Sequence, residues 1–461
     1  MSHGFTRVVL CIFIVQCVVL CATALLFVSF GGSLAHEISN QDAREYMLLA
    51  DSLLEDKQLH LPGLTVPETW RTPGYPAFIA TIFALTNSSL AILLVVLAFI
   101  GAVTSGCIYL IGKELGLPER PATIAGMLFG FSTAVIWIPP SGMGGDIVFA
   151  FLMTVALYLL LRASSWYWLV AVGISLGIAT LVRPLGLYLS LLLIIAAPFL
   201  VPRFTHGAKV VALIFATFML AITPWMARNY SVAGHFALSS QFAFNPFYYN
   251  IPLFYAWQRG TSEEVERTKL TDTVGTRDVY ALVNGFTYYD ELSSIDRRFL
   301  RENLIPYTLF HIYKTIPFFI GSGINVIYAT ITNEIPEMPD VPFFPRAGEN
   351  TATLFYAGNL LATAQNLAYY WPSTLERLVW LMLFIFAFIA PFITNGRQRR
   401  FAIFSIIMIV AIAILSSPIA QPRYRIPAEP FIWLCSILTI YSLAIRKTDL
   451  LLARKPLGPG Y

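Results

Sequence analysis

The chain is poor in charged residues. Of its 461 residues only 12% are Asp, Glu, Lys or Arg, whereas 57% are hydrophobic. A soluble domain carries about a quarter of charged residues. The deficit, with several apolar runs long enough to cross a bilayer, excludes an ordinary soluble protein and predicts an all-α polytopic membrane protein. The net charge is +4, and the Lys and Arg residues lie mostly in short loops. This distribution is typical of membrane topology and not of nucleic-acid binding.

Cysteine and metal-binding patterns are also scarce. The 5 cysteines all fall inside apolar runs, and no C-x-x-C pair is present. This pattern excludes a disulfide framework and a zinc site of the usual spacing, and it predicts small apolar core residues. No H-x-x-x-H spacing, internal repeat or low-complexity tract is found, so we expect one membrane domain over residues 1–461.

What the chain has is a series of apolar segments. The run 8–30 is longer than the hydrophobic part of a signal peptide, and we interpret it as a retained first span. A shorter run, 77–85, is predicted to lie at the membrane interface. The candidate spans are 8–30, 88–112, 121–138, 147–162, 166–182, 185–202, 208–227, 376–393, 401–417 and 429–445.

The distribution of basic residues predicts the orientation. Residues 113–120, Arg162, 203–209, 397–400 and the basic tail fall on one side if the N-terminus is there too. The positive-inside rule makes that side cytoplasmic. Residues 31–87 then form the first extracytoplasmic loop.

A larger extracytoplasmic segment, 229–375, is expected to carry short interfacial or re-entrant helices. Because this segment must begin and end on the extracytoplasmic side, two alternatives remain for its apolar stretches. Either the apolar stretch 304–330 is re-entrant, or it and 354–371 both cross, which gives about ten to twelve helices in total.

The first loop contains a carboxylate and an arginine near a membrane face. Asp42 lies in Gln41-Asp42-Ala43-Arg44-Glu45-Tyr46, and the turn Arg71-Thr72-Pro73-Gly74-Tyr75-Pro76 follows. A carboxylate can take a proton from a hydroxyl, and Arg presents a planar fork to phosphate oxygens. Asp42 has a second interpretation as the N-cap of a helix that starts at Ala43.

Other ionisable residues lie at the extracytoplasmic ends of the predicted spans. Membrane-embedded charges are costly and tend to be functional, although an arginine at a span end can also extend to lipid headgroups. Several arginines on this face favour an anionic substrate, such as a lipid phosphate. The residues concerned are Asp146, Arg183, Arg228, Arg423 and Arg425.

Five short patterns, in this order along the chain, carry a family resemblance. They are Asp42-x-x-x-Tyr46, Arg71-Thr-Pro-Gly-Tyr-Pro76, Leu181-Val-Arg-Pro184, Pro224-Trp-x-x-Arg-Asn-Tyr230 and Arg423-Tyr-Arg-x-Pro427. Together they resemble the polytopic GT-C glycosyltransferases, in the branch related to protein O-mannosyltransferases and the lipid A aminoarabinose transferase. The resemblance covers essentially the whole chain.

The resemblance implies roles for single residues. Asp42 matches the first-loop catalytic acid, and Asp146 matches a second catalytic acid that is Glu in many relatives. Arg71 matches a residue that contacts the lipid phosphate. The remaining expected substrate-binding residues are Tyr46, Tyr75, Arg183, Arg228, Arg423 and Arg425.

Two features of the sequence can be interpreted in more than one way. The aromatic cluster 242–249 can line a sugar or prenyl groove, or it can be packing or an interfacial belt. No cofactor is expected to be required, because arginines can supply the positive charge, although some relatives with diphosphate donors use a divalent cation.

The sequence thus predicts an inverting transferase in the plasma (inner) membrane. It would move a sugar from a polyprenyl-phosphate donor to a lipid A, polysaccharide or protein acceptor on the extracytoplasmic face, with Asp42 as general base. The alternative is a transporter or flippase of a lipid-linked anion, which would need charges at the bilayer midplane and matching halves.

Overall fold

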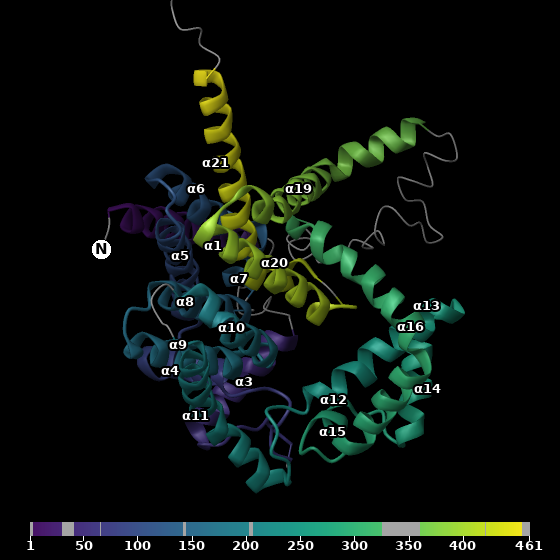
Figure 1. Ribbon diagram of the computed structural model, residues 1–461. Coiled ribbons are helices and arrows are strands. Elements are labelled where there is room, and N and C mark those ends of the chain that lie inside the picture. Colours follow the sequence, from purple (N-terminus) through teal and green to yellow (C-terminus); the bar gives the residue numbers. More distant parts are fainter. Residues whose placement is uncertain are drawn as a thin grey trace, which may run out of the picture.

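The computed structural model describes residues 3–29, 41–64, 66–141, 144–201, 206–324, 360–419 and 421–453. Within these ranges the chain is helical and contains no strand (Figure 1). The predicted all-α polytopic class is therefore confirmed. The alternatives for the stretches 304–330 and 354–371 depend on residues 325–359, which lie outside the described residues.

Seven helices in these ranges are long and apolar enough to cross a membrane. Three shorter apolar helices, α4 (Gly74–Thr86), α9 (Trp166–Val182) and α10 (Gly186–Leu200), lie among them. The seven are α1 (His3–Ser29), α5 (Leu90–Glu114), α8 (Gly145–Arg162), α11 (Gly207–Ala233), α19 (Leu360–Ile393), α20 (Gly396–Ser416) and α21 (Glu429–Ala453), the last with the preceding 3-10 turn η2 (Pro422–Ala428).

Close packing of small residues holds the membrane helices together. Helices α5, α8, α9 and α11 form a continuous row of neighbours (Figure 1). A Cβ on Gly173 of α9 would lie 2.5 Å from the Ile214 carbonyl oxygen on α11. Because lipid is as apolar as a hydrophobic core, such close backbone approach is a main source of helix association in a membrane.

One predicted span, 121–138, is wrong as a single helix. The chain forms α6 (Glu119–Gly130) and α7 (Thr133–Ser141) instead. At the break the Ser132 hydroxyl donates to the carboxylate of Glu429 on α21 over 3.0 Å, and both groups are buried. A buried carboxylate needs such a donor, and this long-range contact is not visible in the local sequence pattern.

The predicted extracytoplasmic segment contains shorter helices. These are α12 (Gln241–Asn245), the π-helical turn η1 (Pro246–Asn250), α13 (Ile251–Arg259), α14 (Glu263–Val274) and α15 (Val279–Val283). The longer α16 (Tyr289–Ile320) follows and is kinked at Asn303. It lies against α12 and η1, away from the main row of helices (Figure 1).

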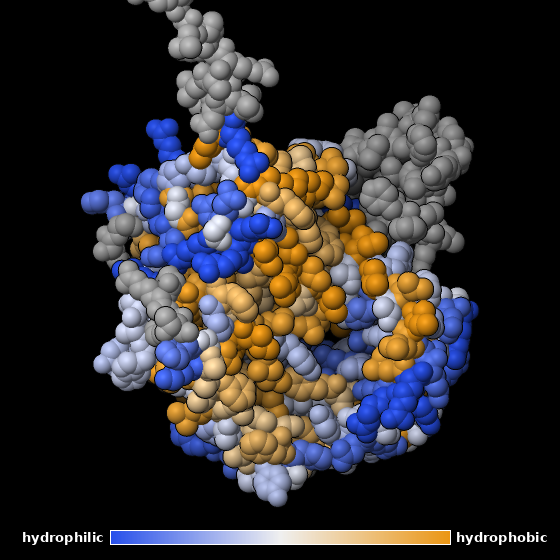
Figure 2. All heavy atoms as spheres, viewed as in Figure 1, coloured by the Kyte–Doolittle hydropathy of each residue, from blue (hydrophilic) through white to orange (hydrophobic). Residues whose placement is uncertain are grey.

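Apolar side chains cover much of the outer surface. Figure 2 shows a hydrophobic band on the viewed face, with hydrophilic residues gathered at its edges. Leu220 on α11, for example, is 73% exposed, and Phe392 on α19 is 82% exposed. Because water does not favour so much exposed apolar area, the band is typical of a surface that faces lipid.

Candidate active site

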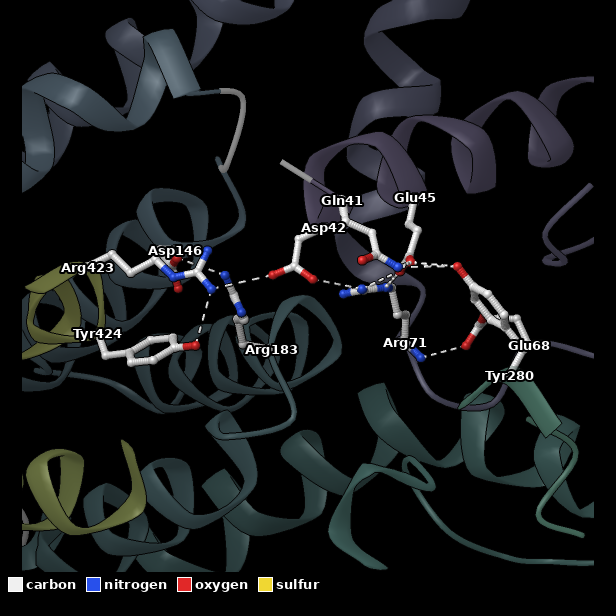
Figure 3. A network of polar contacts seen from close by, with 10 residues as sticks. All are labelled: Gln41, Asp42, Glu45, Glu68, Arg71, Asp146, Arg183, Tyr280, Arg423 and Tyr424. Carbon is white, nitrogen blue, oxygen red and sulfur yellow. Dashed lines mark hydrogen bonds and ion pairs between the residues drawn. The ribbon is translucent and has the colours of Figure 1, made fainter. Parts of the chain in front are cut away.

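Asp42 lies in the first turn of α3 (Gln41–Glu55). The helix begins at Gln41, so Asp42 is inside the helix and does not precede it as the predicted N-cap would. Glu45 and Tyr46 follow at spacings of three and four residues, which places all three side chains on one face. This face of α3 points toward Arg71 (Figure 3).

Arg71 joins the two acids of this helix. Its Nη2 donates to Asp42 Oδ1 over 2.9 Å, and its Nε donates to Glu45 Oε2 over 2.9 Å. The guanidinium also lies between the rings of Tyr46 and Trp70, at 4.6 and 4.3 Å from their centroids. Burial works against the charge, but the acids around Arg71 raise the pKa of its guanidinium above the ordinary value. Arg71 is therefore held rigidly and remains charged.

The turn that carries Arg71 is fixed by Glu68. A single oxygen, Glu68 Oε1, accepts the backbone N–H groups of Trp70 and Arg71, each over 2.7 Å. Burial raises the pKa of Glu68, although these two hydrogen bonds and the charge of Arg71 oppose the shift. The acid thus acts on the backbone of the turn and sets the position of the arginine.

A second group of charges reaches Asp42 from helices that are distant in sequence. Arg423, at the start of η2, approaches Asp42 Oδ2 with Nη2 at 3.4 Å. Arg183, at the C-terminal end of α9, forms an ion pair with Asp146 in the first turn of α8 over 2.8 Å. Figure 3 shows Asp42 between these arginines and Arg71. Arg71 and Arg423 thus contact Asp42 directly, and Asp146 joins the group through Arg183.

A small cavity of about 10 Å³ lies beside Asp42, which is roughly the space of one water molecule. Its lining includes Tyr46, Tyr75, Gly145, Arg183 and Arg423. Within the part of the chain that is described, Arg183 Nε is a buried donor with no hydrogen-bond partner. A phosphate oxygen would supply the acceptor that this donor lacks.

The acids of the site differ in access to solvent. The side chain of Asp42 is 36% exposed, whereas those of Glu45 and Asp146 are 5% and 6% exposed. Burial opposes ionisation of Asp42, but the charges of Arg71 and Arg423 and the hydrogen bond from Arg71 lower its pKa below the ordinary value of 3.8. Asp42 is thus an accessible, ionised carboxylate at neutral pH.

The two tyrosines predicted to bind substrate, Tyr46 and Tyr75, are both buried and both line the cavity. Tyr75 is fully buried, and its ring packs edge-on against Tyr46 with centroids 5.0 Å apart. The Tyr75 hydroxyl also hydrogen-bonds the backbone of Gly144, next to the first turn of α8. Tyr75 therefore ties α4 to α8 at the floor of the cavity.

Two of the predicted substrate-binding arginines are not brought to this cluster. Arg228 donates to the Glu68 carbonyl oxygen over 2.6 Å and stacks on Trp225. Arg425 is completely buried and donates to the Phe318 and Gly321 carbonyl oxygens, each over 3.1 Å. Both residues hold backbone in place, so in this conformation neither is presented to a substrate at Asp42.

Sequence reasoning missed several polar residues of the site. Glu45 accepts hydrogen bonds from Gln41 over 2.9 Å and from the Tyr280 hydroxyl over 3.0 Å. The helical spacing from Asp42 could have revealed Glu45. No local signal points to Tyr280 on α15, which is 235 residues away from Glu45.

The residues of the aromatic cluster 242–249 lie in two different places. Phe244 and Phe247 are fully buried and pack with Trp70, Leu282 and Leu292. Phe242, in contrast, lines a separate cavity, together with part of α16.

The described residues hold no metal-ligand cluster. Among residues 3–324 and 360–453, apart from the short undescribed stretches, no group of three His, Cys, Asp or Glu side chains is arranged to hold a metal ion.

Comparison with known proteins gives one family match. Residues 70–227 match the model of a family described as dolichyl-phosphate-mannose-protein mannosyltransferase. The matched region, about a third of the chain, contains Arg71, Asp146 and Arg183. It supports the resemblance of this region to the GT-C membrane glycosyltransferases. No curated protein matches the chain significantly.

One solved structure that matches is the archaeal oligosaccharyltransferase AglB from Archaeoglobus fulgidus, in complex with an inhibitory peptide and a dolichol-phosphate. The identity is 15% and the TM-score 0.43, over 97% of this chain and 52% of that chain. This chain therefore spans about half of the length of that protein.

Proposed function

We propose that this protein is a membrane glycosyltransferase of the GT-C type. It transfers a sugar from a polyprenyl-phosphate donor to a hydroxyl acceptor at the extracytoplasmic face of a plasma (inner) membrane. The acceptor is a lipid such as lipid A, a cell-surface polysaccharide or a protein. Asp42 is the catalytic base, and the transfer inverts the anomeric centre.

One observation carries this proposal. Asp42 is the accessible acid of the cluster, and it lies between Arg71 on one side and Arg423 on the other. A base next to fixed cations matches a reaction in which a hydroxyl loses a proton while a phosphate departs. Asp146, paired with Arg183, positions that arginine and supports the site from α8.

The distances from Asp42 to the two arginines suggest how the donor phosphate binds. The Asp42–Arg423 contact, at 3.4 Å, is longer than the Asp42–Arg71 contact at 2.9 Å. A phosphate that draws Arg423 toward itself, with Arg183 beside it, removes one of the charges that lower the pKa of Asp42. The base then becomes stronger when the donor is bound.

The proposed transfer step needs only the donor, the acceptor and these residues. The acceptor oxygen forms a bond to the anomeric carbon, and the bond from that carbon to the phosphate oxygen breaks. The acceptor proton passes to Asp42, and the electron pair of the broken bond remains on the polyprenyl phosphate. Arg423 and Arg183 stabilise the charge that develops there, so we propose that no divalent cation is required.

Sugar transfer in membranes tests the proposal. Membranes that contain the protein should transfer label from a radiolabelled polyprenyl-phosphate-sugar pool, and the transfer should persist after EDTA treatment. Movement of the labelled lipid across the membrane without any glycosylated product would instead support a flippase. Loss of transfer in EDTA that Mg²⁺ or Mn²⁺ restores would contradict the metal-free step.

A further inference from the structure

A second, larger cavity lies away from the Asp42 cluster. Its volume is about 320 Å³, within the range of small-molecule sites. Residues of α12, η1 and α13 line one side, and α16 lines the other. These elements lie side by side in Figure 1. None of the residues given above to the base or to the arginine cluster lines this cavity.

The walls of the cavity combine aromatic rings with hydrogen-bonding groups. Phe242, Phe299 and Tyr307 contribute rings, and Asn250 and Ser293 contribute an amide and a hydroxyl. The two apolar C–H faces of a pyranose ring pack on aromatic rings, while its hydroxyl groups at the edge need both donors and acceptors. The wall chemistry therefore suits a sugar better than a purely apolar prenyl chain.

Asp296 is the most unusual residue of this cavity. It is 9% exposed, and its Oδ1 is buried without a hydrogen-bond partner among the residues that the structure describes. Burial raises the pKa of Asp296 to about 8, although the charge of Arg297 opposes the shift. At neutral pH the carboxyl group is thus mostly protonated, and it can both donate and accept hydrogen bonds. An unsatisfied buried polar group is costly, and a ligand hydroxyl offers partners to this carboxyl group.

The charged groups in the cavity wall limit the chemical class of ligand that can bind. Arg297 also lines the cavity and would repel an ammonium group. A neutral polyhydroxylated ring meets no such repulsion, and its hydroxyl groups can accept hydrogen bonds from the Arg297 guanidinium.

We propose that this cavity binds a neutral sugar ring of the acceptor, with Asp296 hydrogen-bonded to its hydroxyl groups and the partly exposed Phe242 packed against its face. The inference rests on the proposed transferase function and extends it to a neutral glycan as the acceptor class. Tyr249, which precedes the cavity residue Asn250 in the chain, lies within the electrostatic influence of Asp42.

Saturation-transfer NMR on the full-length protein in nanodiscs tests this site. The probes are the methyl glycosides of neutral hexoses, with a methyl 4-amino-4-deoxyglycoside and a short prenyl phosphate as competitors. A neutral glycoside should bind to the wild type. Asp296→Leu should weaken binding about tenfold or more, whereas Asp296→Asn, which keeps a donor and an acceptor, should stay within about threefold of wild type. Asp272→Leu, at an exposed acid on α14, is the matched control.

The outcomes separate this inference from the proposed function. Asp42→Asn should stop transfer but leave glycoside binding unchanged. Absence of glycoside binding to wild type, or equal binding to Asp296→Leu, would overturn the inference and leave the transferase proposal standing. Equal loss in Asp296→Asn and Asp296→Leu, with unchanged thermal unfolding, would contradict the role of a neutral acid. Displacement of the glycoside by the prenyl phosphate would assign the cavity to lipid.

Discussion

At the scale of single residues, the site is a chain of alternating charges. Arg71 lies between Glu45 and Asp42, and Asp42 in turn lies between Arg71 and Arg423. Such an arrangement keeps each buried charge paired and places one carboxylate where solvent reaches it. Because Glu45 and Asp42 already orient Arg71, this arginine fixes the position of Asp42 before a substrate is bound.

Glu45 should be a positioning residue for Arg71. Glu45→Gln removes the charged partner of the Arg71 Nε donor, and we expect the protein to lose about 1.5–3 kcal/mol of stability. Transfer should also fall, because Arg71 is then held by Asp42 alone and turns toward it. Thermal unfolding of the purified protein and initial transfer rates measure the two effects. Unchanged stability together with unchanged rate would contradict this role.

The lowered pKa of Asp42 predicts the pH dependence of transfer. A carboxylate with a depressed pKa remains ionised as the pH falls, so kcat/KM should be independent of Asp42 protonation from about pH 8 to pH 5 and should decline only at more acid pH. Arg423→Gln removes one of the charges that lower this pKa. The pH below which kcat/KM declines should then rise by about one pH unit or less. A downward shift would have the wrong sign for this electrostatic account.

At the scale of elements, the site forms where the ends of several helices meet. The first turns of α3 and α8, the end of α9 and the start of η2 each contribute one charged residue. The α4 turn enters this junction closely, since a Cβ on Gly74 would lie 2.6 Å from the backbone carbon of Leu181. Gly74 thus lets the Arg71 turn lie directly against the end of α9 that carries Arg183.

Gly74→Ala should separate these two elements. The added Cβ meets backbone that cannot rotate away, so α4 must shift from α9, and both stability and transfer should fall. Gly207→Ala, at the start of α11, is a suitable control, because its Cβ would meet only Pro198 side-chain carbons, the nearest at 3.1 Å. Thermal unfolding and transfer rates compare the two variants. An equal response of both would argue against a specific role for the α4–α9 contact.

Local periodicity predicted most of the helices but not how they meet. The apolar runs at 88–112 and 166–182 correspond closely to α5 and α9, because lipid requires an apolar and fully hydrogen-bonded segment. The short run 77–85 is part of the regular helix α4, which packs against α3 and α9. The break between α6 and α7 could not be predicted, since it depends on Glu429, which is 297 residues from Ser132.

The candidate site was predicted in part for the same reason. Residue type and order indicated Asp42 and Arg71, and the structure brings Asp146, Arg183 and Arg423 to them. The place of Arg425 could not be inferred from its sequence motif. It lies only two residues after Arg423, yet it turns into the protein and stacks on Trp380 at 3.6 Å.

At the scale of the whole molecule, the acid site and the basic loops lie at opposite ends of the same helices. Asp146 begins α8, and near its other end the Leu161 carbonyl oxygen accepts a hydrogen bond from Arg397. Arg397 also donates to the Glu114 carbonyl oxygen at the end of α5 over 2.8 Å. The 18 residues of α8 extend about 27 Å, close to the hydrocarbon thickness of a bilayer.

This separation predicts which residues react from outside an intact cell. A cysteine in place of the exposed Glu264 on α14 should be labelled by a membrane-impermeant maleimide, whereas a cysteine in place of Arg399 should be labelled only after the membrane is opened. The parent protein provides the control, because its own cysteines lie in apolar helices. The reverse pattern would place the Asp42 site on the cytoplasmic face and contradict the proposed orientation.

The most direct test of the central claim follows both products of the reaction. Purified protein in nanodiscs is given a polyprenyl-phosphate sugar and an acceptor, and mass spectrometry measures the glycosylated acceptor and the released polyprenyl phosphate. We predict one phosphate released for each sugar transferred, a loss of about a hundredfold to ten-thousandfold in Asp42→Asn, and near wild-type rates in Asp51→Asn on the same helix. Retained transfer by a folded Asp42→Asn protein would contradict the account.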